Sequence, residues 1–150
     1  MPVEHVDIVD GERHEPKGAS TALTGQSYVS DGAQSGNWSY PIHYMTVKQG
    51  NINDDAWFVS PVAGTLEVIR SVIGAAVATS DVVMTTNING TPVTGGILTI
   101  TQAASAAGDT DVATPSAANT VAVGDYIHLS NAGGATGGAN TSITIGIRGV

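Results

Sequence analysis

The sequence predicts an all-β fold, an antiparallel β-sandwich of jelly-roll type preceded by an extended N-terminal arm. From Asn51 onward, short apolar runs alternate with polar residues at every second position and are separated by Gly, Asn, Asp and Pro. Charged residues make up 12% of the chain, about half the usual share of roughly 25%, and Ser, Thr, Asn and Gly replace them. No helical pattern separates the runs, which disfavours a parallel α/β fold and favours a sandwich.

The first 20 residues are expected to form an arm that is not part of the core. Five acidic residues stand there against Arg13 and Lys17, and the apolar residues are too few to build a core of their own. Pro and Gly residues within the segment oppose a continuous helix. The composition leaves two interpretations open: a disordered tail, or an arm that becomes ordered against a partner by burying Val6, Ile8 and Val9.

Residues 21–40 are expected to form a hinge between this arm and a β-sandwich domain over residues 41–150. Trp38 and Tyr40 come at the end of the hinge, directly after a run of turn-forming residues, 31–36. The total of 150 residues is enough for one domain with a substantial core.

Short strands are expected along the chain, with Asn89-Gly90 as a hairpin turn. The clearest run is the last, in which Ile143, Ile145 and Ile147 alternate with polar or small residues. Segments 103–119 and 131–140 are expected to be loops, although residues 103–107 could form one helical turn. The expected strands, six to eight of them in the sandwich, are 26–30, 40–47, 57–59, 64–72, 82–88, 97–101, 126–130 and 142–148.

The charge and the residue types exclude several classes of function. The formal net charge is −8 and the five basic residues are scattered, so neither nucleic acid nor an anionic membrane is an expected partner. The N-terminus lacks the features of a signal peptide, and no apolar run approaches the roughly 20 residues that span a bilayer. A soluble protein made in the cytoplasm is therefore expected. The absence of cysteine excludes disulfides, thiolate zinc sites and a cysteine nucleophile.

No metal or other cofactor is expected. His5, His14, His43 and His128 show none of the short spacings of a local metal site. The segment from Asp109 to Asp111 could offer oxygen ligands to calcium, but it lacks the rest of a calcium-binding loop, and an ordinary Asx-type loop is favoured.

No catalytic residues are expected, and the chain is predicted not to be an enzyme. It contains no Gly-x-Ser-x-Gly, P-loop or dinucleotide-binding motif. Glu67 and Asp125 could in principle meet across a cleft as the acids of a glycosidase, but nothing in the sequence brings them together. Asp125 follows Gly124 and is expected to be a turn residue that leads into a strand.

Five of the aromatic residues fall within one third of the chain, and two interpretations remain open for them. They could form a platform on which a sugar stacks, or they could fill the junction between the arm and the sandwich, which is the favoured interpretation. These residues are Trp38, Tyr40, Tyr44, Trp57 and Phe58.

Two blocks of sequence resemble a known family. Residues 14–38, HEPKGASTALTGQSYVSDGAQSGNW, resemble a motif near the N-terminus of tailed-bacteriophage head decoration (cement) proteins and related virion proteins. The runs SPVAGTLEVIRSVI, NINGTPVTGGILTI, AASAAGDTDVATPSAANTVAVGDYIHLS and ITIGIRGV are similar to the β domain of the same proteins. The resemblance extends from about His14 to Arg148.

The resemblance implies a non-enzymatic protein of the outer capsid surface that binds the major capsid protein and stabilises the shell. It also implies self-association, as a homotrimer or a dimer. In that interpretation Arg13 and Lys17 pair with capsid carboxylates, while Trp38 and Tyr40 anchor the base of the arm. The alternative is a carbohydrate-binding or adhesin-type module on a virion. The candidate capsid-contact residues are Val6, Ile8, Arg13, His14, Glu15, Lys17, Trp38 and Tyr40.

Overall fold

A computed structural model describes residues 22–30, 36–133, 135 and 140–150. These residues form eleven strands and no helix, and all strand pairs are antiparallel, so the predicted all-β class is confirmed. The chain divides between Pro41 and Ile42 into two compact units. The predicted arm, residues 1–20, and most of the predicted turn at 31–36 lie outside the described residues.

The first unit contains one antiparallel pair of strands, β1 (Ser27–Ser30) and β2 (Gly36–Ser39). The strand β1 was predicted at 26–30, whereas β2 was not predicted. Tyr28 and Trp38 are opposite each other in this pair. A two-stranded ribbon of this size is marginally stable by itself in water.

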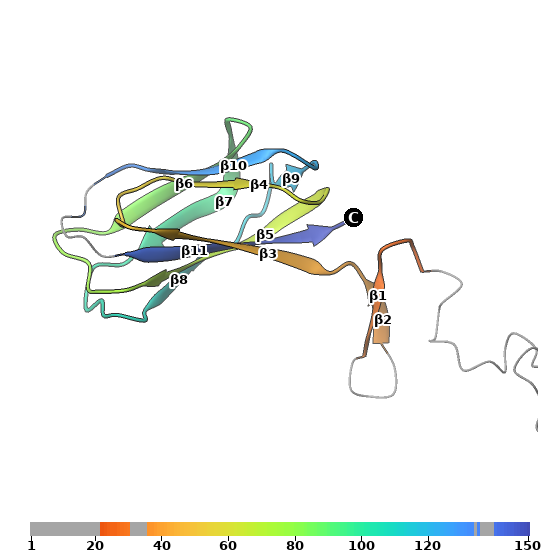
Figure 1. The fold of residues 1–150 in the computed structure, drawn as a ribbon, viewed down its shortest axis with the longest axis horizontal. Helices are drawn as coiled ribbons and strands as arrows, with labels where there is room; N and C mark the ends of the chain where they lie inside the picture. Colours follow the sequence, from red (N-terminus) through yellow and green to blue (C-terminus); the bar gives the residue numbers. More distant parts are fainter. Residues whose placement is uncertain (1–21, 31–35, 134, 136–139) are drawn as a thin grey trace, which may run out of the picture. The chain divides into compact units, whose positions relative to one another are not determined.

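The second unit is built as one long hairpin folded over on itself (Figure 1). Its tip is the β6–β7 pair, and outward from the tip β5 pairs with β8 and β9, β4 with β10, and β3 with β11. Rolling up such a nested hairpin gives the jelly roll. The strands are β3 (Ile42–Gln49), β4 (Ala56–Val59), β5 (Gly64–Ile73), β6 (Val82–Ile88), β7 (Thr91–Ile100), β8 (Thr110–Ala113), β9 (Thr120–Val121), β10 (Tyr126–Asn131) and β11 (Thr141–Gly149).

The rolled hairpin forms two sheets with their apolar faces toward each other. One sheet has the order β4-β10-β6-β7, and the five-stranded sheet has the order β3-β11-β5-β8 with β9 also on β5. Inward residues such as Leu66, Met84, Leu129 and Ile145 are fully buried between the sheets. The alternation of buried and partly exposed residues along β6 and β11 is the period-2 pattern that predicted these strands.

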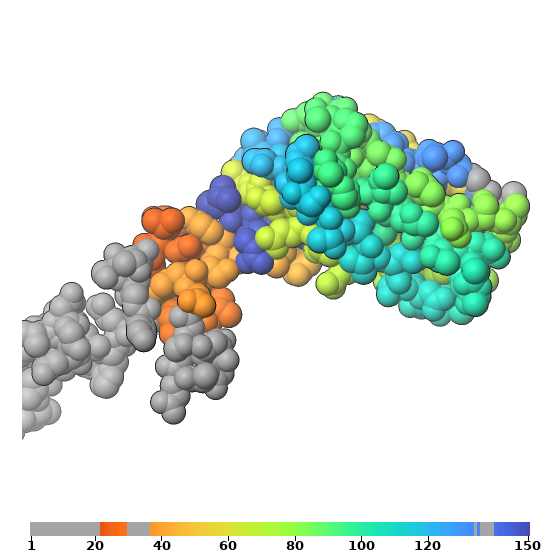
Figure 2. Space-filling view, turned by 180° about the vertical axis from the view of Figure 1, so that it is seen from behind, coloured from red at the N-terminus to blue at the C-terminus, as the bar shows by residue number. Residues whose placement is uncertain are grey.

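The tip of the hairpin confirms the predicted Asn89-Gly90 turn. Both residues have positive φ, 49° and 84°, as the central residues of a type I′ turn require. On the side of the jelly roll seen in Figure 2, the green to cyan chain from β7 to β9 covers the surface. There an isolated bridge between Thr94 and Ala117 ties β7 to the segment after β8.

Several predicted boundaries were wrong. β7 begins at Thr91 and not near residue 97. Pro92 is tolerated because β7 is an edge strand, and Gly95, with a φ of 73°, lies where the pairing register with β6 shifts. The predicted loop at 103–119 contains β8, which pairs with β5. The helical turn considered for 103–107 is absent, and Ala104 has a positive φ of 59°.

Candidate functional site

Of the eight candidate contact residues, only Trp38 and Tyr40 lie within the described residues. The Trp38 ring contacts Tyr28 edge to face, with centroids 5.5 Å apart and planes at 66°. Its indole Nε1 is shielded from solvent and has no hydrogen-bond acceptor among the described residues. The Tyr40 ring lies over Gly25, where an added Cβ would be 3.7 Å from the ring. Val6, Ile8, Arg13, His14, Glu15 and Lys17 lie outside the described residues.

The aromatic residues do not form the single plug that the sequence suggested. Phe58 is buried in the core, while Trp57 beside it in β4 is 57% exposed. Tyr44, also 57% exposed, lies on the five-stranded sheet, whereas Trp57 lies on the four-stranded sheet. Alternation along a strand sends neighbouring aromatics to opposite faces, which the clustering in sequence concealed.

The outer face of the four-stranded sheet carries an aromatic group made of Trp57, Tyr126 and His128. Trp57 and His128 are direct cross-strand partners on β4 and β10. Their rings stack with centroids 3.6 Å apart and planes 10° from parallel, and Tyr126 packs at 5.8 Å and 42° from Trp57. Because the imidazole covers one face of the indole, the exposed area of Trp57 lies on its other face and edges.

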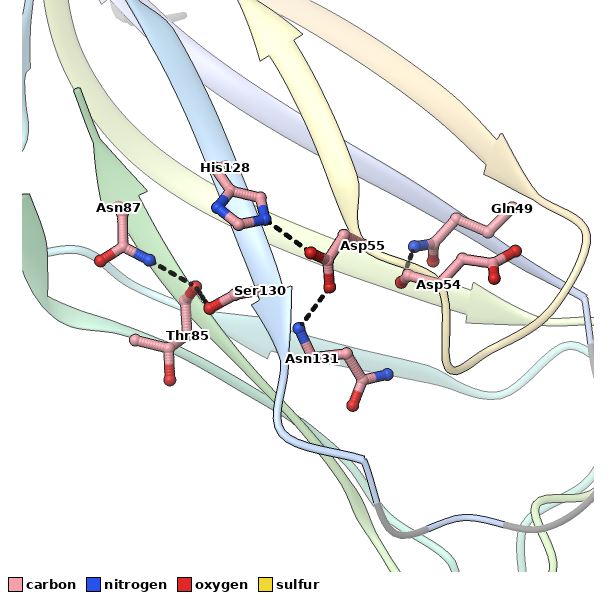
Figure 3. A network of polar contacts seen from close by, with 8 residues as sticks. All are labelled: Gln49, Asp54, Asp55, Thr85, Asn87, His128, Ser130 and Asn131. Atoms are coloured by element: carbon pink, nitrogen blue, oxygen red, sulfur yellow. Dashed lines mark hydrogen bonds and ion pairs between the residues drawn. The ribbon is translucent and has the colours of Figure 1, made fainter. Parts of the chain in front are cut away.

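Polar contacts hold His128, one member of this group, in place (Figure 3). His128 Nε2 lies 2.8 Å from Asp55 Oδ2, and the backbone N–H of Asn131 donates to Asp55 Oδ1 at 2.8 Å. The Asn131 N–H and then the His128 ring stabilise the carboxylate, so the pKa of Asp55 lies below its ordinary value. Three successive contacts therefore set the orientation of Trp57: the Asn131 N–H binds Asp55, Asp55 binds His128, and His128 stacks on Trp57.

Amide and hydroxyl groups continue the same face beyond His128. Asn87 of β6 is opposite His128, and Ser130 is opposite Thr85. Asn87 Nδ2 and Ser130 Oγ both donate to the Thr85 carbonyl, at 3.2 Å each, and Figure 3 shows the three residues side by side. An aromatic plate bordered by such groups can hold a flat, hydroxyl-bearing ligand.

The outer face of the five-stranded sheet is hollowed instead. Tyr44 and Val68 are opposite Gly146 on either side, and they lean over it so closely that a Cβ there would lie 2.8 Å from Val68 and 2.9 Å from Tyr44. Tyr44 and Val68 also line a groove with a volume of about 380 Å³. It is lined by Tyr44, Val68, Arg70, Ser71, Val72, Thr110, Val112 and Thr144.

An ion pair lies on the same sheet. The pairing register of β5 and β11 shifts at Glu67, which has no direct partner on β11. Arg148 donates to both oxygens of Glu67, from Nε at 2.6 Å and from Nη2 at 3.0 Å, and this raises the pKa of Arg148 above its ordinary value. The register shift is the local feature that aims Glu67 at Arg148.

The two carboxylates considered as glycosidase acids are each engaged elsewhere. Glu67 is held by Arg148, whereas Asp125 accepts from Asn89 Nδ2 at 2.8 Å and from the Ala122 N–H at 2.7 Å. These bonds lower the pKa of Asp125, the Ala122 amide contributing most, and they confirm Asp125 as a turn residue leading into β10. The sequence therefore identified the role of Asp125 but not its partner Asn89.

The part of the chain that the structure describes contains no cluster of metal-ligating side chains. There, His43 on β3 and His128 on β10 lie in different sheets, and no three His, Asp or Glu side chains are placed to share a metal ion. No helix in that part is long and apolar enough to cross a membrane. The sequence matches no protein-family model and no curated protein.

Proposed function

We propose that the protein is a non-enzymatic structural component of a bacteriophage virion that binds the outer surface of the assembled capsid and stabilises it. The observation that carries this proposal is the position of the most specific motif, residues 14–38. Its described part belongs to the small first unit, whereas the jelly roll is a second unit with its own core. The jelly roll then serves as the body, and the first unit with the preceding arm serves as the attachment segment.

The composition of the first unit supports an attachment role. A two-stranded ribbon has too few strands to bury an apolar face of its own. Leu23 and Val29 are accordingly 61% and 55% exposed, and Trp38 keeps an indole N–H without a partner among the described residues. Exposed apolar side chains on a marginal element become stable when a partner covers them.

Binding to the assembled shell alone would stabilise the shell by mass action. Repetition of the site over the lattice would let a modest affinity at each site have a large total effect. Arg13 and Lys17 would pair with carboxylates of the major capsid protein, and Trp38 and Tyr40 would anchor the attachment segment. Association into a homotrimer, or a dimer, would add avidity at the virion surface.

The proposal is tested by mixing the purified protein with undecorated capsid shells and imaging the shells. The full chain is expected to occupy regular positions on the outer surface. A variant lacking residues 2–18 is expected to lose this binding while keeping the melting temperature of the jelly roll within a few degrees. Trp38→Ala is expected to weaken binding by about 2 kcal/mol, the loss typical of a central aromatic contact. Retained binding by the truncated protein would overturn the assignment.

A carbohydrate-binding function is the second candidate, because Trp57 presents an open aromatic face held by His128. A sugar ring would stack on the indole while hydroxyls reach the amide and hydroxyl groups beside it. A glycan array with the full chain tests this candidate. The candidate is supported if the array shows binding that is lost in Trp57→Ala and kept in Tyr44→Ala. An array without signal would exclude the glycans tested.

A further inference from the structure

The basic residues of the jelly roll all lie on one face. Lys48, Arg70 and Arg148 are the only Lys or Arg residues in the range 42–150. They occupy outward positions on β3, β5 and β11 of the five-stranded sheet. Arg148 is neutralised by Glu67, whereas no carboxylate of the described residues pairs with Lys48 or Arg70.

The groove on this face combines one of these unpaired bases with shallow apolar walls. Arg70 lines the groove and Lys48 does not. Tyr44, Val72 and Val112, which also line it, are 57%, 44% and 57% exposed. A pocket for a small molecule buries about 70–90% of its ligand, which walls as open as these do not achieve. Tyr and Arg are enriched at the centres of protein interfaces, so the groove is better suited to a segment of another protein.

The pairing register arranges the lining of the groove in three successive rows. Neighbouring rows are two residues, or about 6.8 Å, apart along each strand. The first row is aromatic and apolar, the second contains the cation, and the third contains a valine and a threonine. The rows are Tyr44 with Val68, Thr144 with Arg70 and Val112, and Val72 with Thr110.

The charges around the groove favour a ligand with a single acidic group in the middle row. Arg70 can hold a carboxylate there with two parallel hydrogen bonds. At the third row, Thr110 stands between Asp109 and Asp111 in the chain, and these carboxylates would repel a second acidic group. Each of them accepts a hydrogen bond from segment 101–106, which holds it at that end of the groove.

We propose that the groove binds an extended segment of a partner protein in which aliphatic residues stand two positions before and two positions after one acidic residue. Residues two apart in an extended chain are about 6.8 Å from each other, which matches the spacing of the rows. The acidic side chain would pair with Arg70, while the aliphatic side chains would cover Tyr44 and Val68 at one end and Val72 at the other. This inference concerns the jelly roll alone and does not depend on the attachment role proposed for the first unit.

An NMR titration of the full chain tests the proposal. The probe is the peptide acetyl-Val-Thr-Glu-Thr-Val-amide, which has the required spacing and, with both ends capped, a single charge. Saturable shifts are expected for the backbone amides of Val68, Arg70, Val72 and Val112, while those of β4 and β10 stay unchanged. The absence of saturable shifts up to about 10 mM peptide, the range of weak binding, would overturn the proposal. Shifts centred on β4 and β10 would overturn it as well.

Two control peptides separate the charge from the spacing. Replacing Glu by Gln in the peptide is expected to weaken binding at least about threefold, because the pair with Arg70 is lost. A peptide of the same composition in the order Val-Val-Glu-Thr-Thr is expected to bind more weakly by a similar factor, because its aliphatic side chains cannot reach both outer rows. The proposal fails if either control binds as tightly as the probe.

Matched variants locate the binding in the groove. Arg70→Gln is expected to weaken binding at least about threefold. Lys48→Gln removes the same charge from the same face outside the groove, and the affinity should stay within about twofold. Val112→Thr is expected to weaken binding and Val59→Thr is not, although both valines are exposed, 57% and 63%, on four-residue strands. Equal effects within either pair of variants would contradict the proposal.

Two further measurements test other occupants of the groove. Isovalerate carries a carboxylate beside one aliphatic group, and it is expected to bind at least about tenfold more weakly than the peptide, because it reaches only one outer row. Equal affinity would assign the groove to a small acid and overturn the proposal. Shifts of the same amides when the protein alone is concentrated would assign the groove to a second copy of the chain, with the same consequence.

Discussion

The outer face of the five-stranded sheet and the outer face of the four-stranded sheet show how differently one strand pattern can be used. The first has a groove beside Tyr44 and Val68 and carries every basic residue of the jelly roll. The second carries Trp57 stacked on His128, with Tyr126 tilted against Trp57 and the Asp55 carboxylate bound to His128. Inward positions on both sheets hold similar aliphatic residues, so the fold depends on the inward set while the outward set is free to specify contacts.

The largest effect is expected where the two sheets are alike. Ile145→Ala in the five-stranded sheet and Leu129→Ala in the four-stranded sheet each remove a fully buried side chain, so each should lower the free energy of unfolding by about 2–5 kcal/mol. Denaturant unfolding of the two variants measures this. A loss below 1 kcal/mol in only one of them would show that the sheets do not share one core.

A smaller effect should separate the two outer faces. Gly146→Ala places a Cβ against Val68 and Tyr44, which must move apart, so we expect a loss of about 1–3 kcal/mol. Gly50→Ala is the control, because nothing lies within 4 Å of a Cβ there. Thermal or denaturant unfolding measures both variants. Equal stability of the two would mean that the groove walls yield without cost.

The response to acid should distinguish the faces further. The pKa of Asp55 is lower in the folded protein than in the unfolded chain, so its contribution to stability is present above the ordinary value of 3.8 and disappears as the pH falls through the folded pKa. Arg148 has a raised pKa, so its contribution is present at every acidic pH and is lost only as the pH rises through the folded pKa. Melting temperatures between pH 2.5 and 6 should therefore fall less steeply for Asp55→Asn than for the natural protein, and parallel curves would contradict this.

The smallest effect is expected at the ion pair of the five-stranded sheet. Glu67 and Arg148 are each about one-third exposed, so solvent screens their attraction. Glu67→Gln should cost at most about 1 kcal/mol of unfolding free energy. A loss of several kcal/mol in denaturant unfolding would show that the register shift at Glu67 depends on the charge.

The sequence predicted the fold class and most strands because their signal is local. Alternation along β6 and β11 and the Asn89-Gly90 turn need no knowledge of distant residues. β8 was missed because its residues read as loop, and its strand conformation comes from pairing with β5. β2, with Gly36, Asn37 and Ser39, gave the same weak signal.

The candidate sites were less predictable than the fold. Trp57 and His128 were both noted in the sequence, but their stacking depends on a register between β4 and β10 that no short motif encodes. The groove is lined by residues of β3, β5, β8 and β11. The gathering of Lys48, Arg70 and Arg148 depends on the pairing of β11 with β3 and β5. The bases looked scattered because their separations in sequence are large. The alternation along each strand shows which side chains point outward. It could have placed the three bases on one face only if the order of the strands in the sheet had been known.

The position of β11 has a consequence for biosynthesis. This strand follows all the other described strands in the chain, yet it lies between β3 and β5 and pairs with both. Until the ribosome has released it, the nascent chain holds two strands whose main partner does not yet exist. The sheet must therefore assemble late and through contacts distant in sequence, which makes folding slow and leaves strand edges open to misassociation. A stop codon before Thr141 would remove the strand that joins β3 to the rest of its sheet.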